Sequence, residues 1–169
     1  MSDLLRELGP LALASRLKRL SDRLYRDMSR VYGELDLDME ARWFPVLFLL
    51  SRGGQAAVTE IGERVKMTHP AIHQIAGAMS EAGLLVSEVD GDDQRKRLLS
   101  LSPKGLEVAR RLEPVWDALR AEILDLFGDS EPCLLSRLNQ FEQDLDDAEL
   151  YERMNRRLGG SHGFAATGE

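Results

Sequence analysis

The polar side chains best suited to contact another molecule are concentrated between residues 68 and 74. A helix over 69–82 would bury four apolar side chains that recur at the spacing of one helical face, namely Ile72, Ile75, Ala76 and Met79. Its opposite side exposes hydrogen-bonding groups and one small apolar group near the N-terminal end, where a recognition helix meets base edges in the DNA major groove: Thr68, His69, Ala71, His73 and Gln74. Every surface helix has a polar face, so an ordinary solvated helix is the alternative interpretation.

A second candidate contact is a basic triplet that follows an acidic pair. The segment 84–102 contains two short stretches of apolar residues among polar ones, on either side of a turn at 90–93, and this pattern predicts a β-hairpin. An arginine on such a turn can enter a narrow DNA minor groove, and Asp93 can hold Arg95 extended by a charge-assisted hydrogen bond. The helix 69–82 has no Lys or Arg, so the hairpin must supply positive charge through Arg95, Lys96 and Arg97, which form the predicted wing contacts together with Asp93. The alternative is a solvated turn whose charges favour solubility.

The sequence gives little support to metal, redox or catalytic chemistry. His69 and His73 are one helical turn apart, but no Glu lies between them and the third histidine, His162, is in the C-terminal tail, so we predict no metal and no cofactor. Cys133 is the only cysteine, which excludes an intrachain disulfide and favours a structural thiol over a redox sensor. No nucleophile with a base, glycine-rich phosphate loop or rigidly placed carboxylate pair is present, and we therefore predict that the chain is not an enzyme.

A mainly helical scaffold must position these residues. Beyond the helix 69–82 and the hairpin, we expect a short helix capped by Thr59, and four further helices over 10–32, 39–51, 103–127 and 130–158. Pro45 should kink or restart the helix 39–51, and Pro114 should bend the helix 103–127. Two short helices followed by a hairpin form a winged helix-turn-helix. The first and the last two helices have long apolar stripes and must pack against each other or against a second copy of the chain.

The net charge of −7 is unevenly distributed. Residues 106–169 carry 7 Lys or Arg and 14 Asp or Glu, whereas the two charge types balance in the segments 1–51 and 52–105. DNA affinity depends on the local placement of cations against phosphates rather than on the sum. The net charge therefore neither supports nor excludes a nucleic-acid partner.

The wing carries a specific resemblance. The stretch 93–105, with its Asp, arginines, short apolar strand and Ser102-Pro103-Lys104-Gly105, resembles the wing of the MarR family of transcription regulators. Arg42-Trp43 with Val46-Leu47 resembles the second helix of that family, and the segment 81–85 resembles the end of its recognition helix. The resemblance covers residues 40–110 most densely. Gln94, where many members have Arg, and Pro45, inside the second helix, depart from the family pattern.

The resemblance implies a fold and a domain organisation. The expected fold is mainly α, a winged helix-turn-helix with long N- and C-terminal dimerisation helices. Residues 1–35 would form the N-terminal dimerisation helix, 36–102 the DNA-binding lobe and 103–158 the C-terminal dimerisation helices, with a disordered tail over 159–169. A homodimer would place one recognition helix in each of two major grooves and one wing, through Asp93 and Arg95, in each neighbouring minor groove.

The resemblance also implies a function. We expect a sequence-specific regulator of transcription that binds double-stranded DNA at a pseudo-palindromic operator, more specifically a repressor that responds to a small-molecule effector. Four residues could line the effector site, although the aromatic ones also suit a hydrophobic core: Arg16, Trp43, Phe44 and Trp116. The alternative function is a winged-helix module for protein–protein assembly that binds no DNA.

The chain is expected in the cytoplasm and without a membrane partner. No apolar run approaches the roughly 18 residues of a membrane span. The N-terminus lacks the basic segment, apolar stretch and cleavage site of a signal peptide.

Overall fold

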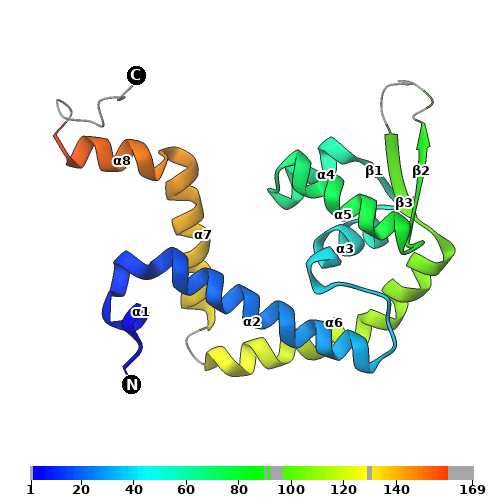
Figure 1. Ribbon diagram of the computed structural model, residues 1–169, viewed down its shortest axis with the longest axis horizontal. Coiled ribbons are helices and arrows are strands. Elements are labelled where there is room, and N and C mark those ends of the chain that lie inside the picture. The colour runs from blue at the N-terminus through cyan, green and yellow to red at the C-terminus, as the bar shows by residue number, and fades with distance from the viewer. Residues whose placement is uncertain (1, 90, 92–96, 129–130, 160–169) are drawn as a thin grey trace. The chain divides into compact units, whose positions relative to one another are not determined.

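The computed structural model describes residues 2–89, 91, 97–128 and 131–159 and is mainly helical, with one small antiparallel sheet (Figure 1). The chain divides into two compact units, one up to Glu113 and one from Pro114 onward. The predicted fold class, a mainly α winged helix-turn-helix, is confirmed. Among the described residues, no helix is long and apolar enough to cross a membrane.

The N-terminal segment contains three helical elements instead of the single helix predicted from residue 10. The short helix α1 covers Leu4–Glu7, a 3-10 helix η1 covers Gly9–Ala12, and the long helix α2 covers Leu13–Glu34. Asp3 caps α1, because its side chain accepts a hydrogen bond of 3.1 Å from the Leu5 amide. Gly9 adopts a left-handed φ of 54° at the junction, which explains why the chain does not continue as one straight helix.

The central lobe has the predicted helices and one strand that was not predicted. A 3-10 turn η2 (Ala41–Trp43) leads directly into α3 (Phe44–Gly53), and Pro45 lies in the first turn of α3, so this proline restarts the helix as expected. The strand β1 (Gln55–Ala57) follows, then α4 (Val58–Val65) and α5 (His69–Glu81). The prediction that Thr59 caps the first short helix is wrong. Ala57 ends β1 with an extended ψ of 151° and is itself the residue before α4.

The sheet contains the predicted hairpin. Strands β2 (Leu85–Val89) and β3 (Arg97–Leu101) pair antiparallel, with Leu85 opposite Leu101 and Val89 opposite Arg97. The strand β1 pairs with the other edge of β3, which gives the order β1-β3-β2. Three of the four wing residues, Asp93, Arg95 and Lys96, lie outside the described residues.

The core of the lobe lies between these helices and the sheet. The helix α3 contacts both α4 and β3, and α5 contacts β2. All four side chains predicted to face inward from α5 are buried, and Ile72 and Met79 are 0% exposed. Other side chains with almost no exposed surface come from the surrounding elements: Leu47, Leu50, Ile61, Leu84 and Leu112.

The junction between β3 and the next helix is tightly packed. The Ser102 hydroxyl donates to the Gly83 carbonyl at 2.6 Å and accepts from the Gly105 amide at 3.0 Å. A Cβ atom at Gly105 would overlap the Leu84 carbonyl oxygen, so no larger residue fits there without movement of the backbone. This contact gives the physical reason for the Ser-Pro-Lys-Gly sequence that opens α6 (Pro103–Phe127).

The first turns of α6 also hold the ends of two other elements. Lys104 Nζ donates to the Ala82 carbonyl at 2.6 Å and lies 3.2 Å from Asp38 Oδ2. Two helical turns further along α6, Arg111 donates a hydrogen bond to the Leu35 carbonyl at 2.6 Å. The segment that joins α2 to the lobe is therefore attached to α6 by two cationic side chains.

The C-terminal unit differs from the prediction in one respect. The predicted bounds of α6 are correct, and Leu126 near its C-terminal end is 77% exposed. The single predicted helix 130–158 is two helices, α7 (Glu131–Asp147) and α8 (Leu150–Arg157). The break falls at Ala148 and Glu149, where the backbone of Glu149 is extended with ψ 148°. The tail 160–169, the side chain of Cys133 and His162 lie outside the described residues.

Candidate nucleic-acid interface

A tight turn brings α4 and α5 together. Lys66 adopts a left-handed φ of 54° after α4, and the Met67 amide donates to the Gly62 carbonyl at 3.0 Å. A Cβ atom at Gly62 would lie 3.2 Å from the Met67 carbonyl oxygen, so glycine permits the close approach of the two helices. The result is a short helix, a turn and a second helix whose outer face is free for contact.

The outer face of α5 carries four of the five predicted contact residues as exposed side chains. These are Thr68, His69, His73 and Gln74, whereas Ala71 is half-buried. Thr68 holds the N-cap position with an extended ψ of 149°, yet its side chain makes no capping hydrogen bond. Its hydroxyl is therefore not used by the first turn of α5.

A groove of about 440 Å³ lies beside this face, between α5, the sheet and the start of α4. His73 and Ser80 line it from α5, Ser87 from β2, and Arg97 from β3. Thr59, near the start of α4, closes one side. The sequence prediction had not grouped Thr59, Ser80 or Ser87 with the site. The spacing of seven residues between His73 and Ser80 was a usable signal, but the position of Ser87 depends on the pairing of β2 with β3.

Positive charge at this surface comes from residues that flank α5. Arg97 is exposed at the start of β3 and has no carboxylate partner in the described part of the chain. Lys66 is exposed in the turn just before α5. The N-terminal end of α5 adds the partial positive charge of the helix dipole. The surface thus combines hydrogen-bonding side chains on α5 with cations from the flanking segments.

Residues 37–96 match the family model described as the MarR family. The resemblance to this family that the wing suggested is confirmed over these residues. Members of this family are transcription regulators rather than enzymes, in agreement with the prediction that the chain is not an enzyme.

Known proteins that resemble the chain support the same fold. The HTH-type transcriptional repressor IacR of Pseudomonas putida is 28% identical over 99 residues, which are 59% of this chain and 58% of that repressor. The chain therefore spans 58% of the length of this relative. Among solved structures, MepR of S. aureus, in a complex with DNA, has a TM-score of 0.69 at 14% identity and covers 79% of this chain and 98% of its own. The PcaV regulator of Streptomyces coelicolor, in complex with its natural ligand, has a TM-score of 0.64 at 24% identity, with 85% and 96% covered.

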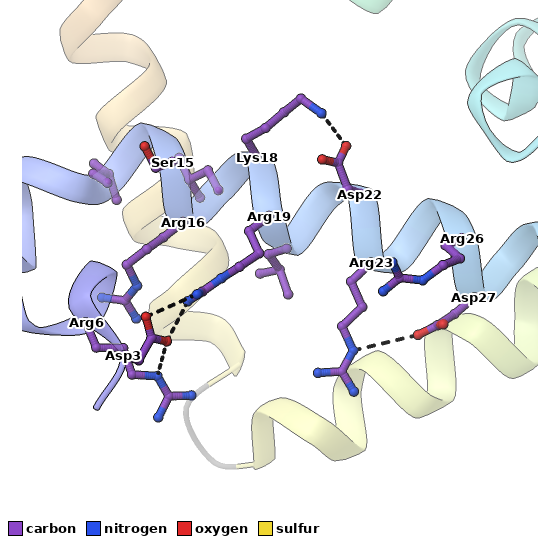
Figure 2. A pocket seen from close by; sticks show the side chains of 13 residues that line it. Asp3, Arg6, Ser15, Arg16, Lys18, Arg19, Asp22, Arg23, Arg26 and Asp27 are labelled. Carbon is purple, nitrogen blue, oxygen red and sulfur yellow. Dashed lines mark hydrogen bonds and ion pairs between the residues drawn. The ribbon is translucent and has the colours of Figure 1, made fainter. Parts of the chain in front are cut away.

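The four predicted effector residues come from four different elements, namely α2, η2, α3 and α6. Trp43 is buried in η2 with 4% of its surface exposed, and its indole nitrogen has no hydrogen-bond acceptor among the described residues. Phe44 is half-buried, with its ring 5.5 Å from that of Phe48. Arg16 is exposed in a groove lined by the N-terminal helices alone (Figure 2). Trp116 is buried and belongs to the other unit. An effector role for these four residues stays a prediction.

The two histidines of α5 do not belong to a cluster of potential metal ligands. Within the part of the chain that the structure describes, no group of three or more His, Cys, Asp and Glu residues could hold a metal ion. Both His69 and His73 are exposed.

Proposed function

We propose that the protein binds double-stranded DNA in a sequence-specific manner and regulates transcription. The observation that carries the proposal is the exposed polar face of α5, flanked by Lys66 and Arg97, within a segment that matches the MarR family. A helix that leaves its N-terminal hydrogen-bonding groups uncovered suits the width of the major groove. The related repressor and the relative solved with DNA support the same function.

Two sets of contacts with different roles follow from the arrangement. Thr68, His69, Ala71, His73 and Gln74 would face base edges and determine sequence preference. Arg95, Lys96 and Arg97 would enter the minor groove and contribute mainly affinity. Asp93 would hold Arg95 extended by a charge-assisted hydrogen bond. The neutral face of α5 offers no bidentate arginine for guanine, so we expect adenine or thymine at the positions read by Gln74 and Ala71.

The functional form is a homodimer on a pseudo-palindromic operator. Twenty of the twenty-three large apolar side chains that are exposed among the described residues lie before residue 36 or after residue 123. Segments 1–35 and 103–158 would bury them between two copies and leave the lobe 36–102 free for DNA. Two recognition helices related by a two-fold axis then require half-sites about one helical turn apart.

Regulation is proposed as repression that an effector relieves. An effector that binds the protein better when the two recognition helices are incorrectly spaced would lower operator affinity. The related repressor supports the sign of regulation, and the relative solved with its natural ligand supports a small-molecule effector. This function requires access to chromosomal DNA, so we also propose a cytoplasmic location.

Selection from a random duplex library followed by titration at several salt concentrations tests the proposal. We expect enrichment of one pseudo-palindrome, an altered preference at defined positions for His73→Ala and Gln74→Ala, and a uniform loss of affinity for Arg97→Ala with a salt slope smaller by about 1. Arg110→Ala is the matched control, because Arg110 is also exposed but pairs with Glu107 on α6. Failure to enrich any sequence, with weak binding that Arg97→Ala leaves unchanged, would overturn the DNA-binding proposal.

A protein–protein assembly module is the second candidate function. The absence of Lys and Arg from α5 favours it, because a helix without cations gains little from phosphates. This candidate predicts that His73→Ala changes binding to a protein partner and that no duplex is selected.

A further inference from the structure

The helix α2 carries five arginines on one face. Arg16 is followed by the others at alternating spacings of three and four residues, and we call this set the arginine stripe: Arg16, Arg19, Arg23, Arg26 and Arg30. It extends over about 21 Å of the helix. Next to it on α2 runs an apolar stripe whose side chains all remain exposed in the single chain: Leu13, Leu17, Leu20 and Leu24.

Local carboxylates compensate only part of the stripe. Arg19 donates two hydrogen bonds to Asp3, at 3.1 and 2.9 Å, and these hold the pKa of Asp3 below its ordinary value. Arg23 lies 3.9 Å from Asp27. Arg16, Arg26 and Arg30 form no ion pair within the described residues. Four arginines of the stripe line a groove of about 1270 Å³, namely Arg16, Arg19, Arg23 and Arg26. Figure 2 shows them along α2, with Arg16 and Arg19 beside Asp3.

The helix α7 has the complementary pattern. Its apolar stripe is formed mainly by exposed side chains, namely Leu134, Leu138 and Phe141. Along one edge of this stripe, Leu135 is followed by Glu142 and Asp146, both exposed and without an ion-pair partner among the described residues. The two helices therefore present apolar stripes of similar kind with flanking charges of opposite sign.

Each helix carries an unfavourable charge at one end: α2 has a cation at its N-terminal end, and α7 has anions at its C-terminal end. The first turn of α2 has no acidic residue and contains Arg16, although the N-terminal end of a helix is partially positive. The last turn of α7 has no basic residue and contains Asp144, Asp146 and Asp147, although the C-terminal end is partially negative. Each helix end is thus destabilised alone, and bringing the two ends together would relieve both.

We propose that the acidic edge of α7 from a second copy of the chain docks on the arginine stripe, with the C-terminal end of α7 near Arg16 and Arg19. The proposal rests on the homodimer of the proposed function and adds the pairing that selects the partner. The apolar stripes supply most of the affinity, and the charged edges fix orientation and exclude other partners of like charge. Two symmetric copies of the contact form in each dimer.

Two charge-reversal variants test this pairing by sedimentation equilibrium. One carries Arg16→Glu and Arg23→Glu, and the other carries Glu142→Arg and Asp146→Arg. The new charges at residues 16 and 146 suit the dipoles of their own helices. Circular dichroism of each variant distinguishes a loss of dimer from a loss of helix. Each variant alone should raise the dimer Kd at least roughly tenfold, because like charges face each other twice in its homodimer. An equimolar mixture should restore dimers, since both contacts of the heterodimer are again complementary.

Lys18→Glu serves as the matched control, because Lys18 pairs with Asp22 on another side of α2. It should leave the dimer Kd within about twofold. Charge-reversal variants that dimerise like the parent would overturn the proposal and leave the dimer itself intact. Restoration only when both reversals are in one chain, and not in the mixture, would show that α7 docks within its own chain and would also overturn it. A parent chain that stays monomeric would instead contradict the dimer of the proposed function.

Discussion

The winged lobe and the terminal helices use their apolar side chains in opposite ways. The lobe buries its large side chains within one chain, as Leu47, Ile61, Ile72 and Met79 illustrate. The helices α2 and α7 have stripes that are equally apolar in sequence but remain exposed. An apolar stripe at helical spacing therefore indicates that this face of the helix becomes buried. The structure shows which helix faces are buried within the chain and which would need a partner. The stability of the lobe should be independent of protein concentration, whereas that of the terminal helices should not.

The largest effect expected within the lobe comes from Gly105→Ala. The added Cβ would overlap the Leu84 carbonyl oxygen, and the backbone where β3 meets α6 must move to admit it. We expect the free energy of unfolding to fall by at least about 3 kcal/mol. Urea denaturation at low protein concentration measures it, and Gly77→Ala is the control, because a Cβ at Gly77 meets nothing within 4 Å. A Gly105→Ala protein as stable as the control would contradict the tight junction.

The difference between the lobe and the terminal helices is tested most directly by comparing the variants Ile72→Ala and Leu20→Ala. Ile72 is 0% exposed, and its truncation should cost about 2–5 kcal/mol at every protein concentration. Leu20 is 55% exposed, and its truncation should leave the unfolding of the lobe unchanged but weaken the dimer. Denaturation at two protein concentrations separates the effects. If Leu20→Ala destabilised the chain equally at both concentrations, the distinction between the two regions would be lost.

A smaller effect is expected from Ser102→Ala. The hydroxyl makes two hydrogen bonds, to Gly83 and from Gly105, and both backbone groups would lose their partner. The loss should be about 1–3 kcal/mol, measured by thermal or urea denaturation. Ser102→Thr keeps the hydroxyl and should recover most of this stability, whereas equal losses for both variants would point to packing rather than hydrogen bonding.

The smallest effect is expected from Arg120→Ala. Arg120 pairs with Asp117 at 2.9 Å, but both side chains are exposed. Exposed pairs of this kind contribute roughly 0–1 kcal/mol, and the free energy of unfolding should change by less than about 0.5 kcal/mol. A loss larger than that of Ser102→Ala would mean that this part of α6 is covered by a partner.

The sequence predicted the elements whose signals are local. The helix α5 has a clear periodicity, and Pro70 and Gly83 mark its two ends, while Ser102-Pro103 fixes the start of α6. The strand β1 was missed because three residues, Gln55–Ala57, show no period and are defined only by their pairing with β3. That strand also displaced the predicted cap at Thr59. The break between α7 and α8 was missed because the apolar spacing continues through Ala148.

In the candidate site, too, the features with local sequence signals were predicted and those that depend on tertiary packing were not. The polar face of α5 follows from the positions of its buried residues, and the structure exposes most of it as expected. The grouping of Ser80, Ser87 and Thr59 around His73 depends on how three elements meet, and no single segment encodes it. The part played by each of these residues in contact with DNA stays a prediction.

The C-terminal end of α5 is attached to the start of α6. This end is fixed, because Lys104 holds the Ala82 carbonyl and Ser102 holds the Gly83 carbonyl, and Lys104 also reaches Asp38 in the segment that comes from α2. The N-terminal end of α5, with Thr68 and His69, is about 20 Å away and follows only a short turn. A rotation of the first turns of α6 would therefore act directly on the C-terminal end of α5, and because Ile72 and Met79 pack this helix into the core, the lobe would move with it.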